Sequence, residues 1–166
     1  PTGNEMANSE TVSGSDGAAP ILLSATYKDT NGDGTVNRID AVYSEAITSS
    51  TFESSDWTFP VNPANLSVGS GAFSGSTVQI TVTGAPANTT VLGTTTVKYT
   101  NQGSSTNSIT DGSNSSATSS VITLSDETVP ILLSATYKDT NGDGTVNRID
   151  AVYSEDITSS TFESSD

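Results

Sequence analysis

An internal repeat constrains this chain more than any other feature. The segment PILLSATYKDTNGDGTVNRIDAVYSE begins at Pro20 and begins again at Pro130, so the two copies are offset by 130 − 20 = 110 residues. The match continues to Asp166 with one difference, Ala46 against Asp156. A period of this length is too long for one turn of a solenoid and is typical of a β-sandwich domain.

The repeat divides the chain into three parts. We expect residues 20–129 to form one complete domain and residues 130–166 to be the first part of a second, nearly identical repeat. Residues 1–19 are interpreted as the tail of a preceding repeat or as a linker, because Asp16 corresponds to Asp126 at the same offset. The partial repeat either continues in a longer chain or is completed by strands from another subunit.

Alternating apolar residues predict β-strands on both sides of the first loop. Ile21, Leu23, Ala25 and Tyr27 are expected to share one face of a strand over residues 21–28. Further short alternating runs separated by turns predict an all-β sandwich. The expected core residues are inward-facing and apolar: Tyr27, Ile39, Tyr43, Trp57, Val78, Ile80 and Val97.

The segment DTNGDGTVNRID, at residues 29–40 and again at 139–150, has the ligand spacing of a calcium loop. Side-chain oxygens, one backbone carbonyl from Thr35 and one water-mediated contact from Asn37 would surround the ion. The predicted ligands are Asp29, Asn31, Asp33, Thr35, Asn37 and Asp40, with Asp139, Asn141, Asp143, Thr145, Asn147 and Asp150 in the second copy. The alternative is a polar hairpin turn that binds no metal.

Composition excludes several classes of function. The chain carries 19 acidic and 5 basic residues, a net charge of −14, which disfavours binding to nucleic acid and to anionic membranes. It has no Cys and no His, so the usual nucleophile–base pairs are missing. Glu53 and Asp56 could in principle act as a glycosidase pair, but nothing distinguishes them from the other acidic residues. We expect no enzymatic activity and no direct membrane insertion.

The order of these motifs resembles bacterial immunoglobulin-like repeats of S-layer proteins and adhesin stalks. The resemblance rests on the block from Pro20 to Glu45, on Thr51-Phe52 and Asp56-Trp57, and on the segments VKYT at 97–100 and ITDG at 109–112. It implies an immunoglobulin-like β-sandwich used as a spacer or assembly module. Such a module would belong to an extracellular or cell-surface stalk, S-layer or filament, and its partners would be neighbouring copies of itself. The Ser/Thr-rich stretch at 104–120 departs from the family, which often has a shorter turn there.

Other interpretations of single features remain open. The loop is also similar to that of dockerins, but dockerin and EF-hand loops run into helices, whereas here a strand pattern follows. An adhesin-type module that recognises carbohydrate is the alternative function, with Trp57 as a sugar platform rather than a core residue. Glu45 either lends a carboxylate to the loop ion or is solvated. Asp126 and Glu127 are either an interdomain calcium site or an acidic linker.

Overall fold

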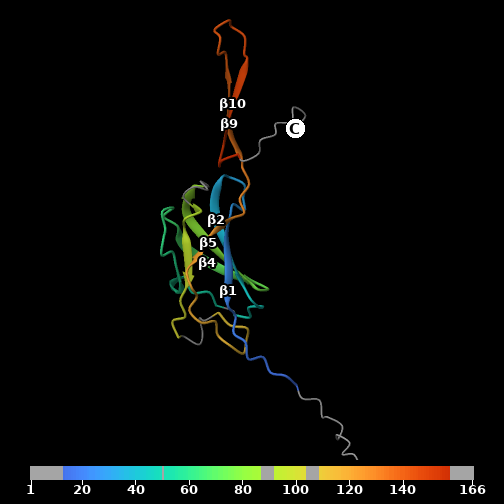
Figure 1. Cartoon of the computed structure of the whole chain (residues 1–166), viewed down its shortest axis with the longest axis vertical. Coiled ribbons are helices and arrows are strands. Elements are labelled where there is room, and N and C mark those ends of the chain that lie inside the picture. The colour runs from blue at the N-terminus through green and yellow to red at the C-terminus, as the bar shows by residue number, and fades with distance from the viewer. Residues whose placement is uncertain (1–12, 50, 87–91, 104–108, 158–166) are drawn as a thin grey trace, which may run out of the picture.

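The computed structural model describes residues 13–49, 51–86, 92–103 and 109–157 (Figure 1). The first part of the predicted tail and residues 158–166 lie outside the described residues. The elements with defined bounds are strands and one short 3-10 helix: β1 Leu22–Lys28, β2 Thr35–Tyr43, η1 Ser54–Asp56, β3 Trp57–Thr58, β4 Ser67–Ser74, β5 Thr77–Pro86, β6 Thr96–Tyr99, β7 Ile122–Thr123, β8 Ser125–Asp126, β9 Leu132–Lys138 and β10 Arg148–Tyr153. The predicted all-β class is confirmed.

Residues 20–126 contain two sheets. The larger has the order β4-β5-β2-β1-β8, with β8 parallel to β1 and the other neighbours antiparallel. The smaller has the order β3-β6-β7. Trp57 on β3 and Val97 on β6 belong to the same hydrophobic cluster as Ile39 on β2 and Ile80 on β5. The side chains of both sheets therefore share one core.

All seven residues that the sequence predicts for the core are buried, none more than 3% exposed: Tyr27, Ile39, Tyr43, Trp57, Val78, Ile80 and Val97. Trp57 packs between Phe52 and Tyr99, with ring centroids 6.4 and 5.3 Å away. The core interpretation of Trp57 is thus confirmed. Each buried aromatic ring removes a large apolar area from water, which is the main favourable contribution to folding.

The predicted face of the first strand is wrong at its beginning. Ile21 and Leu23 are 63% and 58% exposed, whereas Leu22 is 5% exposed and joins the core. The pairing of β1 with β2 has a register shift between Leu22 and Ser24. A bulge of this kind adds one residue on one strand and reverses the alternation of faces. Strict alternation holds only after it, at Ala25 and Tyr27.

Strand β4 extends beyond the short run that Leu66 and Val68 indicate in the sequence. Its glycines bring neighbouring groups close to the backbone: a Cβ on Gly71 would overlap the ring of Phe52, and one on Gly69 would lie 2.6 Å from Thr81 Oγ1. Glycine is unfavourable for a strand by propensity, but here it permits close packing. Phe52, predicted as an anchor, occupies the space above this strand.

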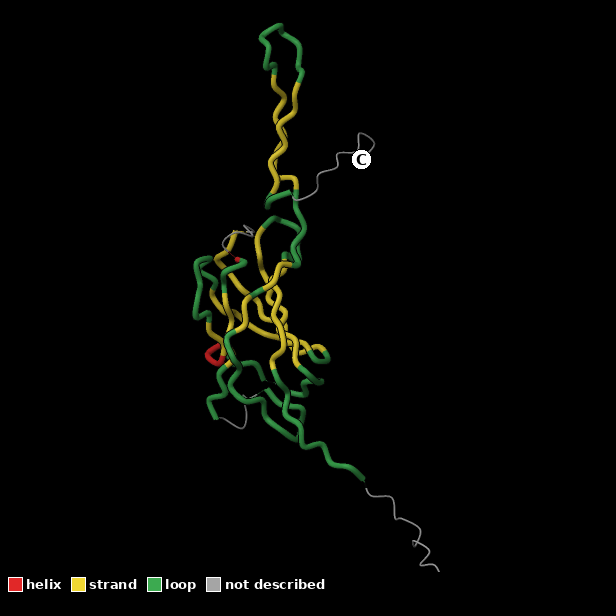
Figure 2. Tube along the Cα trace, in the orientation of Figure 1, coloured by secondary structure: helices red, strands yellow, loops and turns green. Residues whose placement is uncertain are grey.

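The second copy of the hairpin, β9–β10, forms a two-stranded sheet of its own. It extends beyond the loop end of the larger sheet, away from the N-terminal segment (Figure 1; strands yellow in Figure 2). Four of its large apolar side chains are exposed, Leu133 56%, Tyr137 73%, Ile149 59% and Tyr153 40%, whereas Ile131 is partly buried. Across the described residues, no helix has the length and hydrophobicity needed to span a bilayer.

Candidate metal centres

Both predicted calcium loops connect two antiparallel strands, β1 to β2 and β9 to β10. In the first loop, Asp29 organises the backbone. Its Oδ1 accepts hydrogen bonds from the backbone N–H groups of Asn31 at 3.2 Å and Gly32 at 2.8 Å, and its Oδ2 accepts one from Gly34 at 2.7 Å. Gly32 and Gly34 have φ angles of 71° and 82°, a region that favours glycine. The glycines therefore let the chain wrap around a carboxylate.

Asn31 links the other predicted side-chain ligands. Its amide nitrogen donates to Asp33 Oδ2 at 2.8 Å, and its amide oxygen accepts from Asn37 Nδ2 at 2.9 Å. Asp33 Oδ1 accepts the backbone N–H of Thr35 at 2.8 Å. Asn37 Oδ1 accepts two hydrogen bonds from Thr30, at 3.0 and 2.8 Å. The structure thus brings Asn31, Asp33 and Asn37 into direct contact.

The second loop repeats these bonds. Asp139 Oδ2 accepts from Gly144 at 2.8 Å, and Asn141 donates to Asp143 at 2.9 Å and accepts from Asn147 at 2.9 Å. Thr145 donates its N–H to Asp143 at 2.8 Å. The loop geometry is therefore a property of its own residues.

Hydrogen bonds favour the charged form of three loop carboxylates, Asp33, Asp139 and Asp143. The side-chain amide of Asn31, followed by the N–H of Thr35, lowers the pKa of Asp33. In the second loop the N–H of Gly144 is the largest cause of the lowered pKa of Asp139, and that of Thr145 lowers the pKa of Asp143. A group that accepts several N–H bonds is stabilised as an anion, the form that binds a hard cation.

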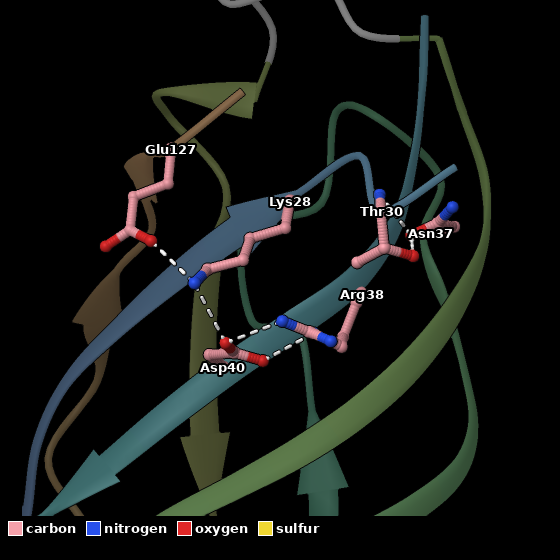
Figure 3. A network of polar contacts seen from close by, with 6 residues as sticks. All are labelled: Lys28, Thr30, Asn37, Arg38, Asp40 and Glu127. Carbon is pink, nitrogen blue, oxygen red and sulfur yellow. Dashed lines mark hydrogen bonds and ion pairs between the residues drawn. The ribbon is translucent and has the colours of Figure 1, made fainter. Parts of the chain in front are cut away.

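The last predicted ligand, Asp40, lies on strand β2 with its carboxylate facing two cations (Figure 3). Lys28 Nζ is 3.1 Å from Oδ2 and Arg38 Nε is 2.7 Å from Oδ1. The Arg38 Nε contact is not aligned as a hydrogen bond, so it is an ion pair, while Arg38 Nη2 donates to Oδ2 at 3.1 Å. Asp150 is held in the same way by Lys138 and Arg148. The structure therefore places Asp40 on the sheet, paired with Lys28 and Arg38. It is not part of the hydrogen bonds that join Asn31, Asp33 and Asn37.

A third acidic group forms at the opposite end of β1 and β2. Carboxylate oxygens of Asp16, Glu45 and Asp111 lie within 4.8 Å of one another and could hold a metal ion. Burial, followed by the charges of Asp111 and Asp16, raises the pKa of Glu45. The N–H groups of Asn114 and Ser113 lower the pKa of Asp111. The cluster therefore holds repelling charges that a cation would neutralise.

Sequence reasoning did not include Asp16 and Asp111 as ligands, and it considered Glu45 only for the loop. These residues are far apart in the chain, so no local spacing marks them. The repeat offset is the one sequence relation that involves two of them, because Asp16 and Glu45 correspond to Asp126 and Glu155. In the structure Asp126 and Glu155 also lie close together. Burial, followed by the charge of Asp126, raises the pKa of Glu155.

The predicted interdomain pair, Asp126 and Glu127, is divided between two partners. The carboxylate of Glu127 lies 2.7 Å from Lys28 Nζ (Figure 3), while Asp126 faces Glu155 and accepts hydrogen bonds from Thr128.

No protein-family model, curated protein or solved structure matches this chain.

Proposed function

We propose that this chain is a segment of an extracellular structural protein built from tandem immunoglobulin-like repeats that bind calcium. The observation that carries the proposal is the loop at residues 29–40, which is built in the same way at 139–150. In each copy, carboxylate and amide oxygens are gathered into one turn by backbone N–H groups. A spacer protein that is stiffened by an ion needs such a site once per repeat.

Calcium is the cation that fits these ligands. They are oxygen atoms on alternate residues in an irregular loop, and calcium tolerates irregular geometry better than magnesium does. A net charge of −14 makes bound cations favourable for the folded chain. Sites in extracellular modules typically bind with dissociation constants of about 10⁻⁴–10⁻³ M, a range that extracellular calcium fills.

The acidic cluster of Asp16, Glu45 and Asp111 provides a second position for calcium in the same proposal. It lies at the end of the domain where the N-terminal segment arrives. An ion there would connect that segment to the strand end at Glu45 and to the turn at Asp111. Such a site would fix each domain to the chain that precedes it.

The adhesin alternative receives less support. A carbohydrate-binding face usually presents exposed aromatic rings, and Trp57 is 3% exposed and stacked on Phe52. Among the described residues 20–129, the large apolar side chains that are exposed are aliphatic: Ile21, Leu23, Val61, Val121 and Val129. The proposal therefore assigns the domain a structural role, with neighbouring copies as its partners.

Thermal unfolding with calcium and with a chelator tests the proposal. Calcium at 100 times its dissociation constant stabilises a folded domain by about 2.7 kcal/mol per site. We expect the melting temperature to rise with calcium and to rise little with the same concentration of magnesium. A melting temperature that is the same in saturating calcium and in chelator would overturn the proposal.

A further inference from the structure

The tip of the first loop contacts the base of the second hairpin. A Cβ placed on Gly34 would lie 3.1 Å from the Cβ of Ser154 and 3.4 Å from Cδ2 of Leu133. A Cβ on Gly32 would lie 3.9 Å from Cδ1 of Ile131. A contact of 3.1 Å is tighter than an ordinary van der Waals contact, so a side chain on Gly34 would require Ser154 to shift. Loop 29–40 therefore lies directly against the following repeat.

The second loop provides an internal control for this contact. Gly142 and Gly144 have φ angles of 74° and 85°, close to those of their counterparts in the first loop. A Cβ on either would meet nothing within 4 Å. The two loops thus share sequence and backbone conformation, and among the described residues the first lies against another hairpin and the second does not.

Residues on both sides of the contact are more buried than their counterparts in the other repeat. Gly34 is partly buried and Gly144 is exposed. At the base of the hairpin, Ile131 and Ser154 are partly buried, whereas their counterparts Ile21 and Ser44 are exposed. The same residues therefore form a covered surface in the second repeat and an uncovered one in the first.

The linker at residues 126–129 lies beside this contact and is bonded to both repeats. Strand β8 pairs with β1, placing Asp126 opposite Tyr27, and Glu127 forms an ion pair with Lys28. Thr128 Oγ1 donates to Asp126 at 2.6 Å and lies 3.2 Å from Glu155 Oε2. The linker thus connects the last strand of one repeat to the base of the next, next to the loop contact.

We propose that loop 29–40 is the docking surface for the following repeat and that it sets the orientation of one repeat relative to the next. The occupant is the base of the next hairpin, formed by Ile131, Leu133 and Ser154. This inference rests on the proposed tandem-repeat function. It gives the loop a mechanical role between domains in addition to its role within one domain.

The orientation can be measured by pulsed electron paramagnetic resonance on the full chain. The protein has no Cys, so Ser67→Cys on β4 and Thr136→Cys on β9, both at exposed positions, provide two unique labelling sites. We expect a narrow distribution of distances between the labels. Gly34→Ala places a methyl group 3.1 Å from the Cβ of Ser154 and should broaden this distribution or shift its mean.

Gly144→Ala is the matched control, because it imposes the same backbone strain on an identical loop that contacts no repeat. It should leave the distribution narrow. A second pair tests the other side of the contact without altering the loop: Ile131→Ser, at a partly buried position, should broaden the distribution, and Ile21→Ser, at the equivalent exposed position of the first repeat, should not. Equal distributions for Gly34→Ala and Gly144→Ala, or for the two Ile variants, would overturn the inference.

The measurement is made in chelator, so its outcome does not depend on calcium binding. Failure of the proposed function appears as an unchanged melting temperature with calcium. Failure of the docking role appears as an inter-label distribution that does not respond to the contact variants. The two results are therefore distinguishable.

Discussion

The hairpins β1–β2 and β9–β10 have the same sequence and differ in what surrounds them. Their strands pair in the same register, with Ala25 opposite Ala41 and Ala135 opposite Ala151, and each has a bulge at the corresponding position. Their burial differs greatly: Ile39 is fully buried, and its counterpart Ile149 is 59% exposed. Strand pairing and loop geometry are therefore specified locally, whereas burial is supplied by the rest of the domain.

One structural difference follows from the missing neighbour. Strand β2 begins at Thr35, and β10 begins at Arg148, further along the repeat. In the first copy, Thr35 and Val36 pair with Pro86 and Ala85 of β5. Among the described residues β10 pairs only with β9, and the counterparts of Thr35 and Val36 in the second copy lie outside a strand. The adjacent strand thus lengthens β2 as well as covering it.

The largest expected difference between the hairpins comes from truncating the buried isoleucine. Ile39→Ala removes fully buried methylene and methyl groups and leaves a cavity, so it should reduce the free energy of unfolding by about 2–5 kcal/mol. Ile149→Ala should change it by less than about 0.5 kcal/mol, as is usual for exposed positions. Urea denaturation followed by Trp57 fluorescence measures both. Equal losses would contradict the assignment of burial to the first hairpin alone.

Calcium provides a test of intermediate size. Asp33→Ser removes a predicted ligand from the loop that belongs to the folded domain, so the rise in melting temperature with calcium should become smaller, leaving only the contribution of the acidic cluster of Asp16, Glu45 and Asp111. Asp143→Ser removes the same ligand from the isolated hairpin and should leave that rise intact, because unfolding of the domain does not involve that loop. Titration calorimetry should show one calcium site fewer for each variant. A rise in melting temperature with calcium that is as large in Asp33→Ser as in the unmodified chain would show that this loop does not contribute to stabilisation by calcium.

The smallest expected effect concerns the ion pairs on the strands. Lys28 contacts both Asp40 and Glu127, whereas Lys138 contacts Asp150. Lys28→Met should cost about 0.2–1 kcal/mol at low ionic strength and less at high salt, because partly exposed ion pairs are weak and screened. Lys138→Met should have no measurable effect on unfolding of the domain. A salt-independent loss for Lys28→Met would indicate that packing of its aliphatic chain matters more than charge.

Alternation of apolar residues was sufficient to predict seven core residues, because each of these side chains lies on the inward face of its own strand. It failed at Ile21 and Leu23, since a bulge shifts the faces without a clear mark in the sequence. Strand β4 was predicted too short, because the reason for Gly71 is the ring of Phe52, which lies 19 positions earlier (71 − 52 = 19). Propensity cannot represent contacts of this kind.

For the candidate sites too, local contacts could be predicted from the sequence, and contacts between distant residues could not. Spacing identified Asp29, Asn31 and Asp33, because their contacts lie within one turn of the chain. Spacing alone could not place Asp40, whose carboxylate faces Lys28 on the neighbouring strand. It also could not assemble Asp16 with Asp111, which only the folded domain brings together.

The identity of the two hairpins also bears on the order in which the chain folds. Residues 57–126 offer one place for a hairpin, between β5 and β8, and the chain carries two with the same inward side chains. During synthesis β1–β2 emerges before these residues, and β9–β10 emerges after them. Refolding from denaturant presents both hairpins at once, so they compete, and exchange between similar repeats is a characteristic failure of such proteins. We therefore expect the order of emergence during synthesis to favour β1–β2 in the domain.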